Sequence, residues 1–194
     1  MSKLSTANLM TLEAYAKARP QLRAEVLAHK KNRTLSLGEH ITLIFEDEMT
    51  IRYQIQEMLR VERVFEEAGI QEELDAYNPL IPDGGNWKAT MLIEYPDVDQ
   101  RQTMLAKLKN IEHHVWVQVT GQAKISAIAD EDLERSNEDK TSAVHFLRFE
   151  LDATSVGAIK QGSDIAIGVS HPAYAVTVPT LAPALRAALA KDLS

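Results

Sequence analysis

The residues best suited to chemistry lie between positions 53 and 62 of this 194-residue chain. Glu57 and Glu62 fall near the edge of an apolar helical stripe, where a carboxylate needs a polar partner. With Tyr53 they can point into a polar pocket under the helix. Paired carboxylates can equally hold a small anionic ligand together with an arginine, Arg60 or Arg148, that makes a two-pronged contact. The further candidates for ligand contact are Asn78 and Arg148.

Histidines extend this set toward metal chemistry. His145 shares a strand face with apolar residues, and His171 sits at a strand end beside Pro172, where it could be held rigidly. Carboxylate and imidazole ligands suit a divalent metal, namely iron, manganese or zinc. The metal candidates are Glu57, Glu62, Glu94, His145 and His171.

Each candidate also has a structural interpretation. Glu57 and Glu62 can be solvated charges at the rim of the helix. His145 can be a hydrogen-bonded core histidine, and His171 a turn histidine in solvent. If the ligand site is real, we expect Glu57→Gln to change what the protein binds while stability hardly moves.

Composition excludes several kinds of chemistry. The chain has no cysteine, so disulfides, thiolate catalysis and iron–sulfur or zinc–thiolate sites within it are excluded. A net charge of -7 with no basic stripe argues against general nucleic-acid binding. We find no glycine-rich phosphate loop, nucleophile elbow or metalloprotease histidine pair. The N-terminus lacks a signal-peptide core and no apolar run has membrane length, so we expect a cytoplasmic protein without membrane contact.

Helices are expected to position the first group of candidates. Apolar residues at three- and four-residue steps predict a long central helix from residue 49 to 68, ended by Gly69, and a short helix from 70 to 77. Two helices are expected earlier in the chain, one ending before Pro20 and one starting there. A loop with Pro79, Pro82 and two glycines then leads into the sheet-rich part.

Alternating patterns predict the strands that position the histidines. They occur at residues 41–45, 87–95, 114–120, 124–129, 143–151, 164–170 and 174–178, with a hairpin turn at Gly121, and a final helix is expected over 181–193. Short turns between neighbouring strands favour antiparallel pairing. We predict a single α+β domain over residues 1–194. Residues 1–82 are mainly helical, and the central helix packs on a mostly antiparallel sheet of about six strands.

An acidic stretch, Asp130 to Lys140, interrupts the sheet-rich part. It is almost wholly polar, so we expect a mobile segment that offers a surface to a partner. Its deletion should leave folding intact.

Three segments resemble an uncharacterised bacterial family, the domain-of-unknown-function family 3501. They are YQIQEMLRVER, EELDAYNPLIPDGGNWKATMLIEYPD and HFLRFEL, and the resemblance extends from Leu9 to the HPAY segment at His171. The family has no assigned activity or catalytic residues. Its members are often encoded beside rubrerythrin-like diiron proteins and iron–sulfur proteins, which implies by analogy an accessory role in redox metabolism or peroxide defence.

Three functions therefore stand side by side. The first is a binding or accessory protein that acts with rubrerythrin-like or iron–sulfur partners. The second is a small metal- or ligand-dependent enzyme that uses a pocket of Glu57, Glu62, His145 and His171. The third is a homo-oligomer that uses the central or the last helix as its interface. The absence of any catalytic motif favours the first.

Overall fold

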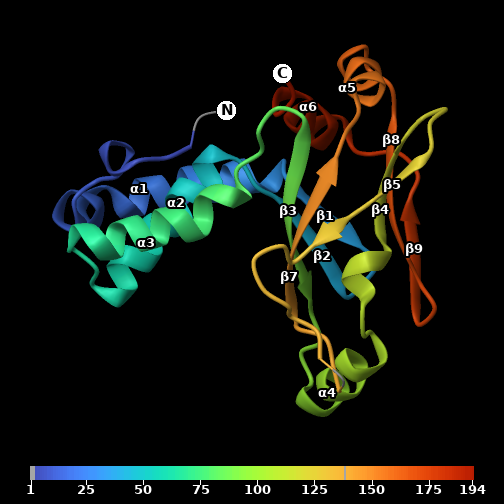
Figure 1. The fold of residues 1–194 in the computed structure, drawn as a ribbon, viewed down its shortest axis with the longest axis horizontal. Helices are drawn as coiled ribbons and strands as arrows, with labels where there is room; N and C mark the ends of the chain where they lie inside the picture. The colour runs from blue at the N-terminus through green and yellow to red at the C-terminus, as the bar shows by residue number, and fades with distance from the viewer. Residues whose placement is uncertain (1–2, 138) are drawn as a thin grey trace.

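In the computed structural model, which describes residues 3–137 and 139–194, a helical part lies beside a part built on two antiparallel sheets (Figure 1). The helical part contains α1 (Leu12–Lys31), α2 (Glu48–Glu62), α3 (Glu67–Tyr77) and the short 3-10 turns η1 (Thr6–Asn8) and η2 (Asn78–Leu80). α2 packs between α1 and α3.

The first helix, α1, is continuous where two helices separated by Pro20 were predicted. Thr11 caps it by accepting a hydrogen bond from the Ala14 amide at 3.3 Å. Tyr15 and Val26 are buried on either side of Pro20. Since α1 packs against α2, this tertiary packing outweighs the backbone hydrogen bond that the proline removes.

The predicted helix over residues 49–68 is interrupted. α2 ends at Glu62, and Arg63 takes a left-handed backbone conformation with a φ of 56°. A new helix, α3, begins at Glu67, so Gly69 lies inside it and is not a cap. The turn at Arg63 lets α3 pack back against α2, and this packing replaces the extension of one long helix.

The interruption also changes which apolar residues of this segment are buried. Val61 and Phe65, which the helical pattern places on the core side, are 62% and 72% exposed. Ile51, Ile55 and Leu59 are buried in a helical cluster that includes residues from α3 and the N-terminal segment. α2 is therefore held chiefly by helices, with its apolar face turned away from the core between the sheets.

The sheet-rich part confirms the α+β class and the antiparallel pairing. The five-stranded sheet has the order β1 (Thr34–Leu37), β2 (Ile41–Phe45), β3 (Asn86–Ile93), β7 (Val144–Glu150), β6 (Ile128–Ala129). The four-stranded sheet has the order β5 (Lys124–Ser126), β4 (Val115–Val119), β8 (Ile165–His171), β9 (Tyr174–Val178). The described residues thus form two sheets where one of about six strands was expected.

Four further elements join or flank these strands. They are α4 (Val98–Lys107), η3 (Ile111–His114), α5 (Ala153–Lys160) and α6 (Pro183–Lys191). Side chains from both sheets and from α6 share one buried cluster. Because side chains alternate along a strand, Trp87, Ala89 and Met91 of β3 enter this cluster, which leaves Lys88 and Thr90 on the outer face toward α3.

Within residues 3–137 and 139–194, no helix combines the length and apolar character needed to span a membrane. That the helical and sheet-rich parts form a single domain stays a prediction.

Candidate functional site

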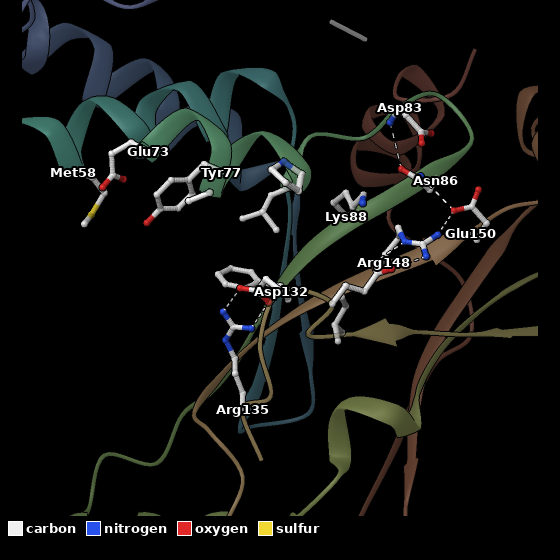
Figure 2. Close-up of a pocket in the computed structure, with 16 residues that line it drawn as sticks. Met58, Glu73, Tyr77, Asp83, Asn86, Lys88, Asp132, Arg135, Arg148 and Glu150 are labelled. Atoms are coloured by element: carbon white, nitrogen blue, oxygen red, sulfur yellow. Dashed lines mark hydrogen bonds and ion pairs between the residues drawn. The ribbon is translucent and has the colours of Figure 1, made fainter. Parts of the chain in front are cut away.

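A groove lies between α3 and the outer face of the five-stranded sheet. Its volume is about 590 Å³, and its walls come from α2, α3, η2, β3, β7 and the loop after Asp130. Figure 2 shows Glu73 and Tyr77 on the helix side of the groove and Lys88 and Arg148 on the strands. A concave site that combines apolar walls with a few polar groups is the usual form of a ligand-binding site.

The pairing of β3 with β7 sets the floor of the groove. In this antiparallel register Lys88 lies opposite Arg148, and Thr90 lies opposite Phe146. Residues directly opposite one another share a face, so two cations and an aromatic ring meet on the outer side of the sheet. Leu80 from η2 adds a further apolar wall.

Arg148 is already bound by two carboxylates of the protein. Its guanidinium donates two hydrogen bonds of 2.8 Å to the Glu131 carboxylate and a third to Glu150. The Glu131 contact raises the pKa of Arg148 further above its usual range. The two-pronged contact that the sequence assigned to an anionic ligand is thus made by the protein's own Glu131.

Lys88 is different, because its side-chain amine makes no hydrogen bond or ion pair with any described residue although the side chain is partly buried. Burial, and secondly the charge of Arg148, lower the pKa of its ammonium group; Glu131, Asp83 and Glu150 act in the opposite direction. Its amine is therefore available to a molecule in the groove.

A carboxylate with no hydrogen-bond partner among the described residues lies at the helix side of the groove. Glu73 of α3 is partly buried, and burial, with Glu62 and Glu72 nearby, raises its pKa. Tyr77 and Leu80 also line a neighbouring cavity of about 220 Å³ that reaches Thr50 and Thr90. The groove therefore offers an amine, a carboxylate and apolar surface.

Three of the predicted ligand-binding residues lie together on α2, away from this groove. Glu57 accepts two hydrogen bonds from Arg19, at 2.7 and 2.8 Å, one from Tyr15 at 2.8 Å and two weaker ones from Arg60. Tyr53 lines a separate cavity of about 190 Å³ beside this cluster. Glu57 therefore connects α1 to α2, and its carboxylate oxygens already accept hydrogen bonds from side chains of the protein.

Glu57→Gln should consequently destabilise the protein, in contrast to the small effect expected from the sequence. Hydrogen bonds from Arg19, opposed by burial and assisted by Arg60 and Tyr15, lower the pKa of Glu57 from 4.5 to about 2. The carboxylate thus contributes stability above about pH 4.5 that is lost as pH falls toward 2. Since the two arginines are partly exposed, we expect a loss of about 1–2 kcal/mol at pH 7.

Urea unfolding of wild type and Glu57→Gln at several pH values measures this loss. The difference should shrink as pH falls below about 4.5. Glu62→Gln, at an exposed position on the same helix, is the matched control and should change stability little. A difference between wild type and Glu57→Gln that stays constant down to about pH 2.5 would contradict the assignment.

The other predicted residues do not converge. Glu62 is exposed, and Glu94 is an exposed carboxylate that accepts a hydrogen bond from Thr42. Asn78 is buried and pairs with the backbone of Leu4 through both its amide oxygen and its amide nitrogen. The last of them, His171, donates to the Lys109 carbonyl and packs on His114. The predicted metal set of Glu57, Glu62, Glu94, His145 and His171 is therefore not assembled.

His145 instead joins a buried network with two carboxylates that the sequence did not single out. Its Nδ1 donates to Asp130 at 2.6 Å, and its Nε2 lies 2.8 Å from the Thr141 hydroxyl. Thr141 and Ser136 both donate to Glu112, at 3.3 and 2.5 Å. The His145, Asp130 and Glu112 side chains are 0%, 7% and 3% exposed.

Within the described part of the chain, Glu112, Asp130 and His145 form the group that could hold a metal ion. Their ligand atoms lie within 4.8 Å of one another, and Asp130 orients the ring as carboxylates do behind metal-binding histidines. Each polar atom already has a hydrogen-bond partner in the network, however. The arrangement is thus the hydrogen-bonded core histidine that was the structural interpretation of His145.

The acidic segment is packed where it begins and near its middle. Asp130 and Ser136 enter the buried network, and Arg135 lies over the ring of Phe146 with 4.6 Å between its guanidinium carbon and the ring centre. The segment thus forms one wall of the groove through these packed residues, while residues 131–134, 137, 139 and 140 are exposed; that it offers a surface to a partner stays a prediction, and Glu138 lies outside the described residues.

These features define an α+β protein with a ligand-sized groove between a helix and a sheet. The chain matches the family described as Protein of unknown function (DUF3501) over residues 3–193, and it belongs to that family. The resemblance carried by the sequence motifs is thereby confirmed.

A crystal structure at 1.90 Å resolution, of a novel protein of unknown function from Burkholderia pseudomallei K96243, is similar over its whole length. The two chains are 53% identical, with a TM-score of 0.95 and coverage of 100% of both. No curated protein matches the chain.

Proposed function

We propose that the protein is a binding protein whose ligand is a small molecule with an apolar body and an oxygen acceptor, such as a carboxylate or carbonyl. The observation that carries this proposal is the partly buried Lys88 amine in the groove, which has no hydrogen-bond partner among described residues. A desolvated donor without a partner costs free energy that a ligand acceptor would recover.

The walls of the groove support the apolar part of this ligand. Tyr77, Pro79 and Leu80 lie on the helix side, and Phe146 lies on the sheet. Aromatic and aliphatic side chains of this kind bind planar apolar molecules, and the few polar groups fix their orientation.

A titration followed by two-dimensional nitrogen–proton NMR tests the proposal, with benzoate and benzamide as probes. We expect shifts concentrated at the groove. Lys88→Met should weaken binding of benzoate at least about tenfold, since a hydrogen bond to a charged group contributes more than 1.4 kcal/mol. Lys107→Met, at an exposed position on α4 outside the groove, should bind like wild type. Shifts elsewhere, or equal binding by Lys88→Met, would overturn the proposal.

The finer predictions drawn from the sequence and from the family resemblance are compatible with this role. An accessory function in redox metabolism or peroxide defence, rubrerythrin-like or iron–sulfur partners, homo-oligomer formation and a cytoplasmic location all stay predictions. Purification with and without those partner proteins would test the association directly.

A further inference from the structure

Lys88 has an unusual place among the lysines because a second cation faces it across the strand pair. Its partner in the register of β3 and β7 is Arg148. Like charges directly opposite one another repel. Glu131 and Glu150 offset the charge of Arg148 by direct contact, whereas Lys88 receives no such contact from a described residue.

This environment weakens the preference of the Lys88 amine for its ammonium form, although Glu131, Asp83 and Glu150 act in the opposite direction. The ammonium group is partly withdrawn from water beneath α3, and Arg148 adds a like charge, so the pKa is lowered. A lysine that is desolvated or placed beside another cation is a stronger nucleophile at neutral pH than an exposed lysine. The groove in turn gives a small carbonyl compound room to reach the amine.

We propose that Lys88 forms a reversible imine with an aldehyde or ketone bound in the groove. The inference rests on the proposed function, since it specifies the acceptor group of the same ligand as a carbonyl. The amine nitrogen attacks the carbonyl carbon and gives a carbinolamine. In that intermediate one amine proton has moved to the former carbonyl oxygen. The C–O bond then breaks, the oxygen leaves as water with the second amine proton, and the carbon–nitrogen double bond forms.

Different residues of the groove contact different parts of the ligand. Phe146 and Leu80 contact the apolar body of the carbonyl compound, and Lys88 supplies the covalent bond. Glu73, on the helix side, can accept a hydrogen bond from a hydroxyl or amine at the other end of the ligand. The class of ligand is therefore an aromatic or branched aldehyde or ketone.

Reductive trapping tests the inference on the full-length protein. Benzaldehyde is added with sodium cyanoborohydride, which reduces an imine to a stable secondary amine, and intact mass followed by peptide mapping locates the benzyl group. We expect one benzyl group, on Lys88, before Lys107 and the other exposed lysines are labelled. Lys88→Arg preserves the charge and cannot form the imine, so the label should be lost while the melting temperature is kept.

The outcomes separate the imine from the groove itself. Label on Lys88 that is lost in Lys88→Arg supports the inference. Label spread over the exposed lysines, or unchanged in Lys88→Arg, overturns it. If benzamide still shifts the groove resonances while Lys88 stays unlabelled, the imine is overturned and the binding function stands; if neither occurs, both fall.

Discussion

Arg33→Leu is expected to destabilise the protein by about 3–5 kcal/mol, because it leaves buried carboxylates without their cation. Arg33 is 2% exposed and donates to the carbonyls of Phe45 and Glu46. Its guanidinium also binds Asp192 near the C-terminus and lies 3.4 Å from Asp47, the residue that caps α2. One side chain, from a residue between α1 and β1, thus joins β2, the N-terminal cap of α2 and the segment after α6.

Thermal unfolding measures this effect, and we expect the midpoint to fall by roughly 10 °C for a chain of this size. Arg52→Leu is the matched control. Arg52 is exposed and forms a loose ion pair with Glu48, with 3.7 Å between nitrogen and oxygen, so this substitution should cost less than about 1 kcal/mol. Burial raises the pKa of Asp192 even beside Arg33. Replacing Asp192 by Leu together with Arg33 should therefore recover part of the loss. An Arg33→Leu variant that melts like wild type would refute this account.

The strands were predictable where alternation was strong. The segments at 41–45, 87–95 and 143–151 alternate more and less buried residues because one face of each enters the core. The division into two sheets was not predictable, since β3 pairs with β7 about sixty residues further on. Such long-range pairing leaves no local pattern. The same holds for β6, which has two residues and exists only through its contact with β7.

The helices failed to follow the sequence pattern where tertiary packing decided the outcome. The apolar periodicity predicts a central helix that continues beyond Arg63, because Val61 and Phe65 keep the helical spacing. Both side chains are nevertheless exposed. Pro20 predicts a helix boundary, yet α1 continues through it. Apolar spacing shows which residues can share a face, and only the packing partner determines whether that face is buried.

The candidate site was predictable in part. Alternation along β3 placed Lys88 on the face opposite Trp87, but nothing local indicated that α3 would cover that face and leave the amine without a partner. The position of Glu57 near an apolar stripe predicts that this carboxylate needs a polar partner, but the partner, Arg19, lies on another helix and leaves no local pattern. Glu112 and Asp130 carried no signal, since their partner His145 is distant in sequence.

Asp130→Ala should cost about 3–5 kcal/mol, because it removes the carboxylate that the buried His145 needs. Asp130 accepts hydrogen bonds from the His145 ring and, at 2.9 Å, from the Phe146 amide. Its φ of 51° adds a backbone cost for alanine, since left-handed residues other than glycine favour aspartate or asparagine. Deletion of Asp130–Lys140 should be at least as damaging, which reverses the expectation drawn from its polar composition.

The backbone and network contributions can be separated by two further variants in urea unfolding. Asp130→Asn keeps the left-handed preference and an acceptor for the Phe146 amide, so its loss should be smaller than that of Asp130→Ala. Asp132→Ala removes an exposed carboxylate from the same segment and should cost less than about 1 kcal/mol. Equal, small losses for Asp130→Ala and Asp132→Ala would mean that the segment is a dispensable surface. A large loss confined to Asp130 would mean that it anchors the loop that walls the groove.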